Sequence, residues 1–254
     1  MQEIKGLSKY CRNTAVDNDV SFTVKPGEVT GYLGPNGSGK STTVKIITAL
    51  IEPSSGKVLL DGKDIRDDLI GFKRGLGYVP EEAILYSYLT GLEYLQLMGC
   101  LRGMPPAEVE RKANDLLALF QLHSYRHAPI SAYSKGMKQR ILISAALMHD
   151  PDVLVLDEPL SGIDVTSALL FKHLLNELAR RGKMILYISH VLEVVEKVCA
   201  QVIIIYRGRI MAADSVEHLR DLTKVPSLEE IFSQLVEHRD LEGVARDIAC
   251  AIEK

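Results

Sequence analysis

The sequence has no long apolar segment: no run approaches the roughly 18 residues that a membrane-spanning helix needs. Its first ten residues, MQEIKGLSKY, contain no apolar core of signal-peptide length. Cysteine is scarce as well, and the four cysteines lie far apart with no CxxC pair, which argues against a disulfide framework or a zinc site. We therefore expect a cytosolic protein with reduced thiols, in which any membrane role depends on a partner.

An excess of positive charge is also absent. Lysine and arginine number 30 against 33 aspartates and glutamates, a formal net charge of −3, which argues against a nucleic-acid binder that works through a general basic surface. The chain has 254 residues, 46% of them hydrophobic, so it can bury a sizeable core without metal or disulfide cross-links. That length corresponds to one large domain or two small ones.

Strands and turns are expected up to about residue 80, apart from a helix that begins near Lys40. The short segments Val20–Val24, Val29–Leu33 and Lys57–Leu60 have the alternating or β-prone pattern of strands. The last of these runs into Asp61-Gly62, a hairpin turn signal. These patterns therefore predict that the N-terminal third of the chain is rich in β-strands.

A helical region is expected over about residues 82–150. Its apolar residues at spacings of three and four include Val109, Ala113, Leu116, Leu117 and Phe120. Behind it, the short apolar runs Val153–Leu156 and Met184–Ile188 suit parallel strands covered on both faces. Ser167–Arg181 lies between them and has helical periodicity. This β-α-β order predicts an α/β fold with a helical insertion.

The tail beyond about residue 215 is expected to be helical. Ser227-Leu228-Glu229-Glu230 has the spacing of a capping box. A second apolar stripe follows, formed by Leu241, Val244, Ala245, Ile248 and Ile252. Both helices are expected to pack on their own domain, and a contact with a partner is the alternative.

The segment Gly34-Pro35-Asn36-Gly37-Ser38-Gly39-Lys40-Ser41 matches the phosphate-binding loop pattern at every required position. Glycines let the backbone curl so that successive N–H groups point at one phosphate, and the following helix adds its positive N-terminal end. The Lys40 ammonium can neutralise the β- and γ-phosphates, and the Ser41 hydroxyl can ligate Mg²⁺. A plain glycine-rich turn is the alternative, but a chance match is expected in roughly one such chain in a hundred.

Two acidic residues, Asp157 and Glu158, directly follow the apolar run Val153–Leu156. An acidic residue at the end of a buried parallel strand faces the ligand crevice of an α/β sheet. We expect Asp157 to hold Mg²⁺, usually through water, and Glu158 to reach the water that attacks the γ-phosphate. Two acids that only mark the end of a strand are the alternative, but the phosphate loop favours the functional interpretation.

In these motifs and their order the chain resembles the nucleotide-binding subunits of ABC transporters, over most of its length up to about Ala213. Tyr10 stands where the family has the aromatic residue that stacks on adenine. His190 looks like the switch histidine that touches the γ-phosphate. Ser161-Gly162-Ile163-Asp164 is similar to the D-loop at the dimer interface.

The resemblance implies a set of site residues. Catalysis is expected from Glu158, His190 and Lys40. Mg²⁺ is expected at Ser41, Asp157 and Glu81. ATP is expected to contact Tyr10, Gly34, Pro35, Asn36, Gly37, Ser38, Gly39, Lys40, Ser41, Thr42, Ser134 and Gly136.

The resemblance also implies an architecture. The expected fold is a P-loop NTPase with a parallel-sheet core, an N-terminal antiparallel β-subdomain and an inserted helical subdomain. The nucleotide-binding domain is expected to span residues 1–214, with the helical subdomain at about 82–150, and residues 215–254 are expected to form a C-terminal helical extension.

Two segments depart from the family's pattern. The signature LSGGQ is replaced by Tyr133-Ser134-Lys135-Gly136-Met137, in which Ser134 and Gly136 match. The serine hydroxyl and the N–H groups that open the next helix are what meet the γ-phosphate, so this contact can persist. In the Q-loop, Pro80 is followed by Glu81 where the family has glutamine. Its carboxylate can still ligate Mg²⁺, but it adds negative charge near the phosphates.

The implied function is a Mg-dependent ATPase that binds and hydrolyses ATP to power a membrane transporter, and its motifs look more like those of exporters than of importers. In the family each ATP lies between the phosphate loop of one subunit and the signature of the other. The implied partners are therefore a second nucleotide-binding subunit, identical or homologous, and a separate transmembrane permease. The subunit is expected at the cytoplasmic face of the cell membrane, and no nucleic acid is expected.

Two other function classes stay open at this point. A soluble ABC ATPase acting on nucleic acid or ribosomes is one, although only a short segment separates Lys40 from Ser134, where DNA-repair members have a very long coiled coil. An unrelated P-loop enzyme, such as a small-molecule kinase, is the other. It would not need the segment around Ser134, and it would give Glu158 no obvious role.

Overall fold

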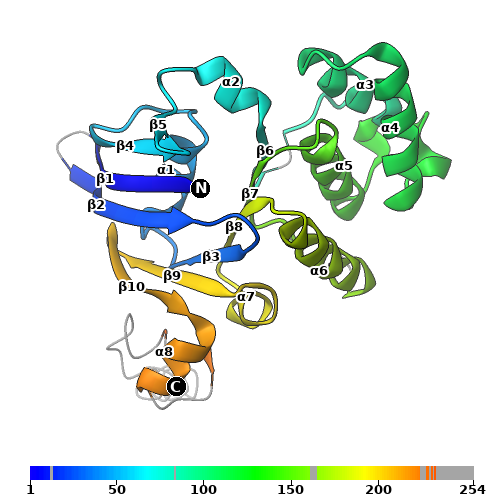
Figure 1. Ribbon diagram of the computed structural model, residues 1–254. Helices are drawn as coiled ribbons and strands as arrows, with labels where there is room; N and C mark the ends of the chain where they lie inside the picture. Colours follow the sequence, from blue (N-terminus) through cyan, green and yellow to red (C-terminus); the bar gives the residue numbers. More distant parts are fainter. Residues whose placement is uncertain are drawn as a thin grey trace, which may run out of the picture.

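Two β-sheets lie side by side in the protein, whose computed structural model describes residues 1–11, 14–82, 84–160, 165–223, 227–228, 230 and 232 (Figure 1). The antiparallel sheet has the strand order β2-β1-β4-β5 within the described residues. Its strands are β1 (Gln2–Cys11), β2 (Thr14–Val24), β4 (Ser55–Leu60) and β5 (Lys63–Asp64). The predicted hairpin turn at Asp61-Gly62 joins β4 to β5 and is confirmed.

The second sheet forms the centre of the molecule, in the order β10-β9-β3-β8-β7-β6 among the described strands. Its strands are β3 (Val29–Leu33), β6 (Leu76–Val79), β7 (Val153–Asp157), β8 (Met184–Ser189), β9 (Gln201–Tyr206) and β10 (Arg209–Ser215). All neighbouring pairs are parallel except β9 and β10, which are antiparallel. The parallel core, the antiparallel β-subdomain and the helical region that were predicted are therefore confirmed.

Apart from their last residues, Asp157 and Ser189, the strands β7 and β8 are hydrophobic because both faces of the central sheet are covered. Val153 and Val155 of β7 face the antiparallel sheet and helix α1 (Lys40–Ile47), whereas Leu154 and Leu156 face the helices on the other side. Successive side chains of a strand point to opposite faces, so a strand that is covered on both sides favours apolar residues at successive positions. The same alternation occurs along β8.

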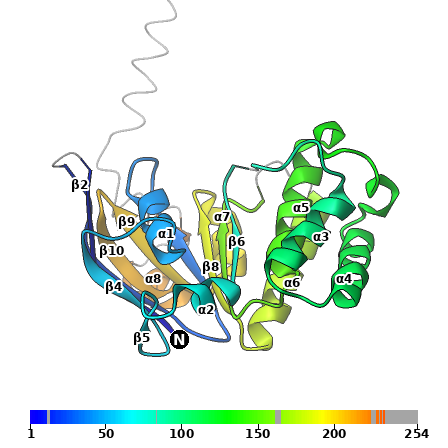
Figure 2. The ribbon, with the colours of Figure 1, turned by 90° about the horizontal axis from the view of Figure 1, so that it is seen from above.

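The opposite face of the central sheet is covered by α6 (Val165–Arg180) and α7 (Leu192–Val198), which pack in the same hydrophobic cluster as α8 (Val216–Thr223). The helical region consists of α3 (Gly91–Leu101), α4 (Pro106–Leu119) and α5 (Lys135–Leu147), with short 3₁₀ turns between α4 and α5. These three helices stand together, apart from the antiparallel sheet, in both views (Figures 1 and 2). Across the described part of the chain, no helix is long and apolar enough to cross a bilayer.

Two expectations for secondary structure were wrong. Residues before 80 include a helix, α2 (Leu69–Arg74), which is too short to show periodicity and buries only Phe72. Its cap at Asp68, which accepts from the Gly71 N–H at 2.8 Å, is the local signal for it. The helical region begins at α3, not at residue 82, because Thr90 and Glu93 form a capping box there. The D-loop and the second stripe of the tail lie outside the described residues, and the division at residues 214 and 215 stays a prediction.

The carboxyl group of Asp17 lies in a buried polar network that joins β2 to α1. The Thr43 hydroxyl donates to Asp17 Oδ2 at 3.1 Å, and the Tyr32 hydroxyl donates to Thr43 Oγ1, also at 3.1 Å. Asp17 Oδ1 has no hydrogen-bond partner among the described residues. Burial raises the pKa of Asp17 to about 6, and the Thr43 hydrogen bond only partly opposes this shift.

Replacing Asp17 with asparagine is expected to increase stability in a pH-dependent way. The pKa of Asp17 is higher in the folded protein than in the unfolded chain. Its contribution to the free energy of unfolding is therefore fully present below about pH 4 and is lost as the pH rises through about 6. Urea unfolding is expected to show the stability of Asp17→Asn, relative to wild type, rising by about 1.4 kcal/mol from about pH 5 to about pH 7.5. Asp19→Asn, at an exposed position of the same strand, is the matched control. A relative stability of Asp17→Asn that does not change with pH would contradict the account.

Candidate functional site

The phosphate loop connects the end of β3 to the start of α1, as predicted. Gly37 has φ +78° and Gly39, which precedes α1, has φ +107°, a backbone region that side chains with a Cβ rarely adopt. No described side chain caps α1, and the N–H groups of Lys40 and Ser41 make no hydrogen bond among the described residues, so they are left for an anion at this end of the helix. The loop is therefore shaped for an anionic ligand.

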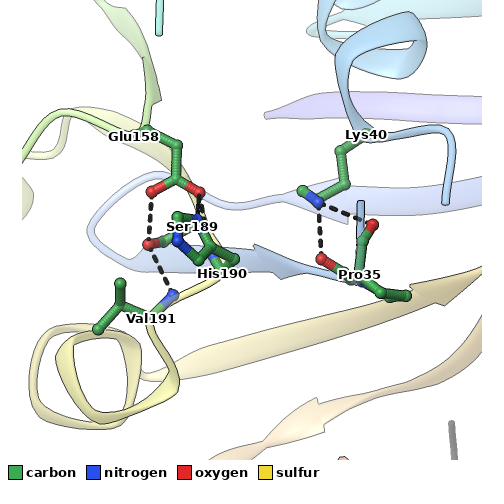
Figure 3. A network of polar contacts seen from close by, with 7 residues as sticks. Pro35, Lys40, Glu158, Ser189, His190 and Val191 are labelled. Carbon is green, nitrogen blue, oxygen red and sulfur yellow. Dashed lines mark hydrogen bonds and ion pairs between the residues drawn. The ribbon is translucent and has the colours of Figure 1, made fainter. Parts of the chain in front are cut away.

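The Lys40 ammonium is held over the loop by main-chain oxygens. It donates to the Gly34 carbonyl at 2.6 Å and to the Pro35 carbonyl at 3.1 Å (Figure 3). Burial lowers the pKa of Lys40, and the neighbouring carboxylates oppose this shift. The Ser38 hydroxyl is buried in the same loop and has no partner among the described residues.

Three carboxylates face this loop from neighbouring strands. Asp157 ends β7 and Glu158 follows it, while Glu81 comes shortly after the adjacent parallel strand β6. The carboxyl ends of parallel strands meet at one edge of a sheet, which explains why these acids converge. Burial, reinforced by the negative charges of Glu81 and Glu158, raises the pKa of Asp157 to about 6 despite the opposing charges of Lys40 and Lys45.

Glu158 is held by the segment that ends β8. Its backbone is left-handed, with φ +47°, and its N–H donates to the Ile188 carbonyl at 3.0 Å. One carboxylate oxygen accepts from the His190 N–H at 2.8 Å and lies 2.5 Å from His190 Nδ1, and the other accepts from the Ser189 hydroxyl at 3.0 Å (Figure 3). A strained backbone combined with a fully engaged side chain indicates a residue whose position matters for function.

One cavity of about 250 Å³ brings most of the predicted site together. It is lined by Asn36, Gly37, Gly39, Lys40, Ser41, Thr42, Glu81, Asp157, Glu158 and His190. Gly34 and Pro35 lie behind Lys40 and hold it through their carbonyls. The sequence placed His190 here only by resemblance, and it gave Ser189 no role, although this serine directly precedes His190 at the end of a strand.

Six predicted ATP contacts do not line this cavity: Gly34, Pro35 and Ser38 belong to the phosphate loop itself, whereas Tyr10, Ser134 and Gly136 lie outside it. Tyr10 lies near the end of β1 and is 54% exposed, with its ring available to a flat ligand. Ser134 is the N-cap of α5, where its hydroxyl accepts from the Met137 N–H at 3.2 Å. α5 stands apart from α1 in both views of the ribbon (Figures 1 and 2).

The donor set of the cavity fits Mg²⁺ that binds together with a phosphate ligand. The described residues contain no group of three or more metal-ligating side chains that would form a metal site by themselves. Mg²⁺ prefers oxygen and is usually held through one or two carboxylates, water and substrate phosphates. The Ser41 hydroxyl and the carboxylates of Asp157 and Glu81 supply such oxygens at the wall of the cavity. The three carboxylates also leave an excess of negative charge that a divalent cation would offset.

Comparison with known proteins gives a consistent result. A family model described as ABC transporter matches residues 18–161. The ABC transporter ATP-binding protein NatA of Bacillus subtilis (strain 168) is 38% identical over 220 residues, which cover 86% of this chain and 89% of NatA. The linearmycin resistance ATP-binding protein LnrL of the same organism is 36% identical over 212 residues, 84% of this chain and 68% of LnrL. A dimeric structure of the ATP-binding cassette MJ0796, in a post-hydrolysis state bound to ADP and Pi, has a TM-score of 0.79 and 26% identity, covering 85% of this chain and 99% of that chain.

Proposed function

The chain belongs to the ATP-binding subunits of ABC transporters, which hydrolyse ATP to drive transport, and we propose that the cavity at the phosphate loop is its catalytic site. The observation that carries this proposal is the convergence of a cationic phosphate loop and three carboxylates on one cavity. The loop N–H groups and Lys40 bind the β- and γ-phosphates, and the ring of Tyr10 stacks on adenine. Ser41, Asp157 and Glu81 hold Mg²⁺ against the phosphates, where it offsets their charge during the reaction.

Glu158 is the general base of the hydrolysis. Its carboxylate accepts a proton from water as the water oxygen bonds to the γ-phosphorus, and the bond from that phosphorus to the β–γ bridging oxygen breaks, which gives ADP and phosphate. His190 touches the γ-phosphate and lies beside the base, with Nδ1 at 2.5 Å from the Glu158 carboxylate. Lys40 stabilises the charge that builds on the leaving ADP oxygen.

The site is completed by a second subunit. Ser134 and Gly136, at the N-terminus of α5, do not line the cavity of their own chain. A helix N-terminus favours an anion, and an ATP bound to a second chain would supply one. We therefore place the ATP of each cavity against the α5 N-terminus of a partner copy. The dimeric structure of MJ0796 supports such pairing.

Transport requires a separate permease that this subunit drives. We infer that the subunit binds that permease at the cytoplasmic face of the membrane, as an ATP-binding subunit of this family does. The resistance named for LnrL supports an exporter over an importer. Purification of the chain with its native membrane partner, followed by identification of that partner, tests this inference. A ribosomal or nucleic-acid partner in place of a permease would contradict it.

Trapping of the ATP-bound dimer tests the composite site. Glu158→Gln is expected to sediment with about twice the monomer mass in MgATP and as a monomer in MgADP, because the γ-phosphate is the ligand that both chains share. Adding Ser134→Arg, which places a bulky cation at the α5 N-terminus, is expected to prevent dimerisation while ATP binding to the monomer persists. Ser124→Arg, an exposed serine outside α5, is the matched control. An ATP-dependent dimer that survives Ser134→Arg would contradict the composite site.

A further inference from the structure

The hydroxyl of Ser189 lies against the carboxylate that the proposed function assigns as general base. Ser189 is the last residue of β8 and is 2% exposed. Its partner Glu158 follows β7, and because β7 and β8 pair in parallel with Asp157 opposite Ile188, the two side chains meet at the same edge of the sheet. The left-handed backbone of Glu158 turns it back over the end of β8, where its N–H reaches the Ile188 carbonyl.

The direction of the Ser189 hydrogen bond follows from its second partner. The Val191 N–H donates to Ser189 Oγ at 3.1 Å, so a lone pair of the hydroxyl oxygen is occupied (Figure 3). An ionised carboxylate can only accept, so the single hydroxyl hydrogen of Ser189 points at Glu158 Oε2, 3.0 Å away. When Glu158 is ionised, these two hydrogen bonds can therefore run in one direction only. The Val191 N–H donates to Ser189 Oγ, and the Ser189 hydroxyl donates to the Glu158 carboxylate.

Ser189 is the better fixed of the two side chains that hold Glu158. The side chain of His190 is 64% exposed, and turning its ring towards a bound phosphate would break its contact with Glu158. Ser189 is buried and locked by the Val191 N–H, so its bond to Oε2 does not depend on the position of the histidine ring. A group fixed in this way can hold the carboxylate in place while His190 responds to the nucleotide.

We propose that Ser189 is a positioning residue for Glu158, which it aims at the attacking water. This inference rests on the proposed role of Glu158 as general base. Ser189 does not line the ATP cavity, so the effect of its hydroxyl on the reaction passes through the Glu158 carboxylate. A base displaced by about 1 Å can lose about a hundredfold in rate, so loss of this hydroxyl is expected to reduce turnover without weakening ATP binding.

Steady-state ATPase assays on Ser189 variants test the proposal. Ser189→Ala is expected to lower kcat about ten- to a hundredfold and to change KM by less than about threefold. Threonine and valine have the same shape and differ only in the hydroxyl, so Ser189→Thr is expected to retain much more activity than Ser189→Val. This pair isolates the hydroxyl even where the alanine variant folds poorly. Ser144→Ala removes a buried hydroxyl that donates to the Arg140 carbonyl in α5, and it is expected to leave kcat within about twofold of wild type.

Combination with Glu158→Gln separates this inference from the proposed function. If Ser189 acts through Glu158, Ser189→Ala is expected to cause no further loss of single-turnover rate in the Glu158→Gln background. Three results would overturn the role of Ser189. One is an equal loss of single-turnover rate from Ser189→Ala in both backgrounds, and another is an equal kcat for Ser189→Thr and Ser189→Val. The third is a loss of kcat/KM that comes from a higher KM with kcat unchanged. A Glu158→Gln variant with wild-type turnover would instead overturn the proposed function itself.

Discussion

Replacing Lys40 with alanine is expected to abolish measurable ATP binding. Among the described residues that line the cavity, Lys40 is the one lysine or arginine, and it faces three carboxylates. Without its ammonium the triphosphate would meet an acidic wall with only main-chain N–H groups and Mg²⁺ to offset the charge. Each tenfold loss of affinity corresponds to about 1.4 kcal/mol, and charged hydrogen bonds to two phosphates are worth several times that. Titration calorimetry with MgATP measures the loss.

Lys45→Ala is the matched control for this experiment. Lys45 lies on the same helix as Lys40, but it is exposed and does not line the cavity. Its replacement removes the same charge from α1 and is expected to leave ATP affinity within about threefold of wild type. A wild-type ATP affinity of Lys40→Ala would contradict the proposed role of the phosphate loop.

Replacing Glu158 with glutamine is expected to reduce ATP turnover by about 10²–10⁴-fold, the usual effect of losing a general base. The amide has nearly the shape of the carboxylate and can still accept the hydrogen bond from Ser189, but it cannot take a proton from water. ATP affinity is expected to stay within about threefold of wild type, because the phosphates are held by the loop and by Lys40. Phosphate release under saturating MgATP measures the turnover.

Glu193→Gln controls for the loss of a negative charge near the site. Glu193 lies in the first turn of α7 beyond His190 and does not line the ATP cavity. Its variant is expected to keep turnover within about threefold of wild type. Turnover that falls equally in both glutamine variants would assign the effect to local charge and not to proton transfer at Glu158.

Much of the fold and of the candidate site could be predicted because the signals are local in the sequence. The phosphate loop is a contiguous segment, and the strand that ends in Asp157 and Glu158 is recognisable as one apolar run. Parallel strands then bring their carboxyl ends together, which places these acids near the loop without any further information. Glu81 was predicted only through the resemblance to the family's Q-loop, and the structure places it after β6 in the same cavity.

The remaining features depend on contacts between residues distant in the sequence. The network of Asp17, Thr43 and Tyr32 forms only when β2 and β3 pack around α1, so no local pattern predicts its buried carboxylate. The role inferred for Ser189 depends on the left-handed backbone of Glu158, an uncommon conformation for a glutamate that sequence does not indicate.

The most direct test of the central claim, that this cavity binds and hydrolyses ATP, measures ATP occupancy and phosphate release in the same samples. Wild type is expected to bind MgATP and release phosphate. Glu158→Gln is expected to bind it and release almost none within the time in which wild type completes a turnover. Lys40→Ala is expected to do neither, so the two variants fail at different steps. Phosphate release by Glu158→Gln at the wild-type rate, with equal ATP occupancy, would contradict the account.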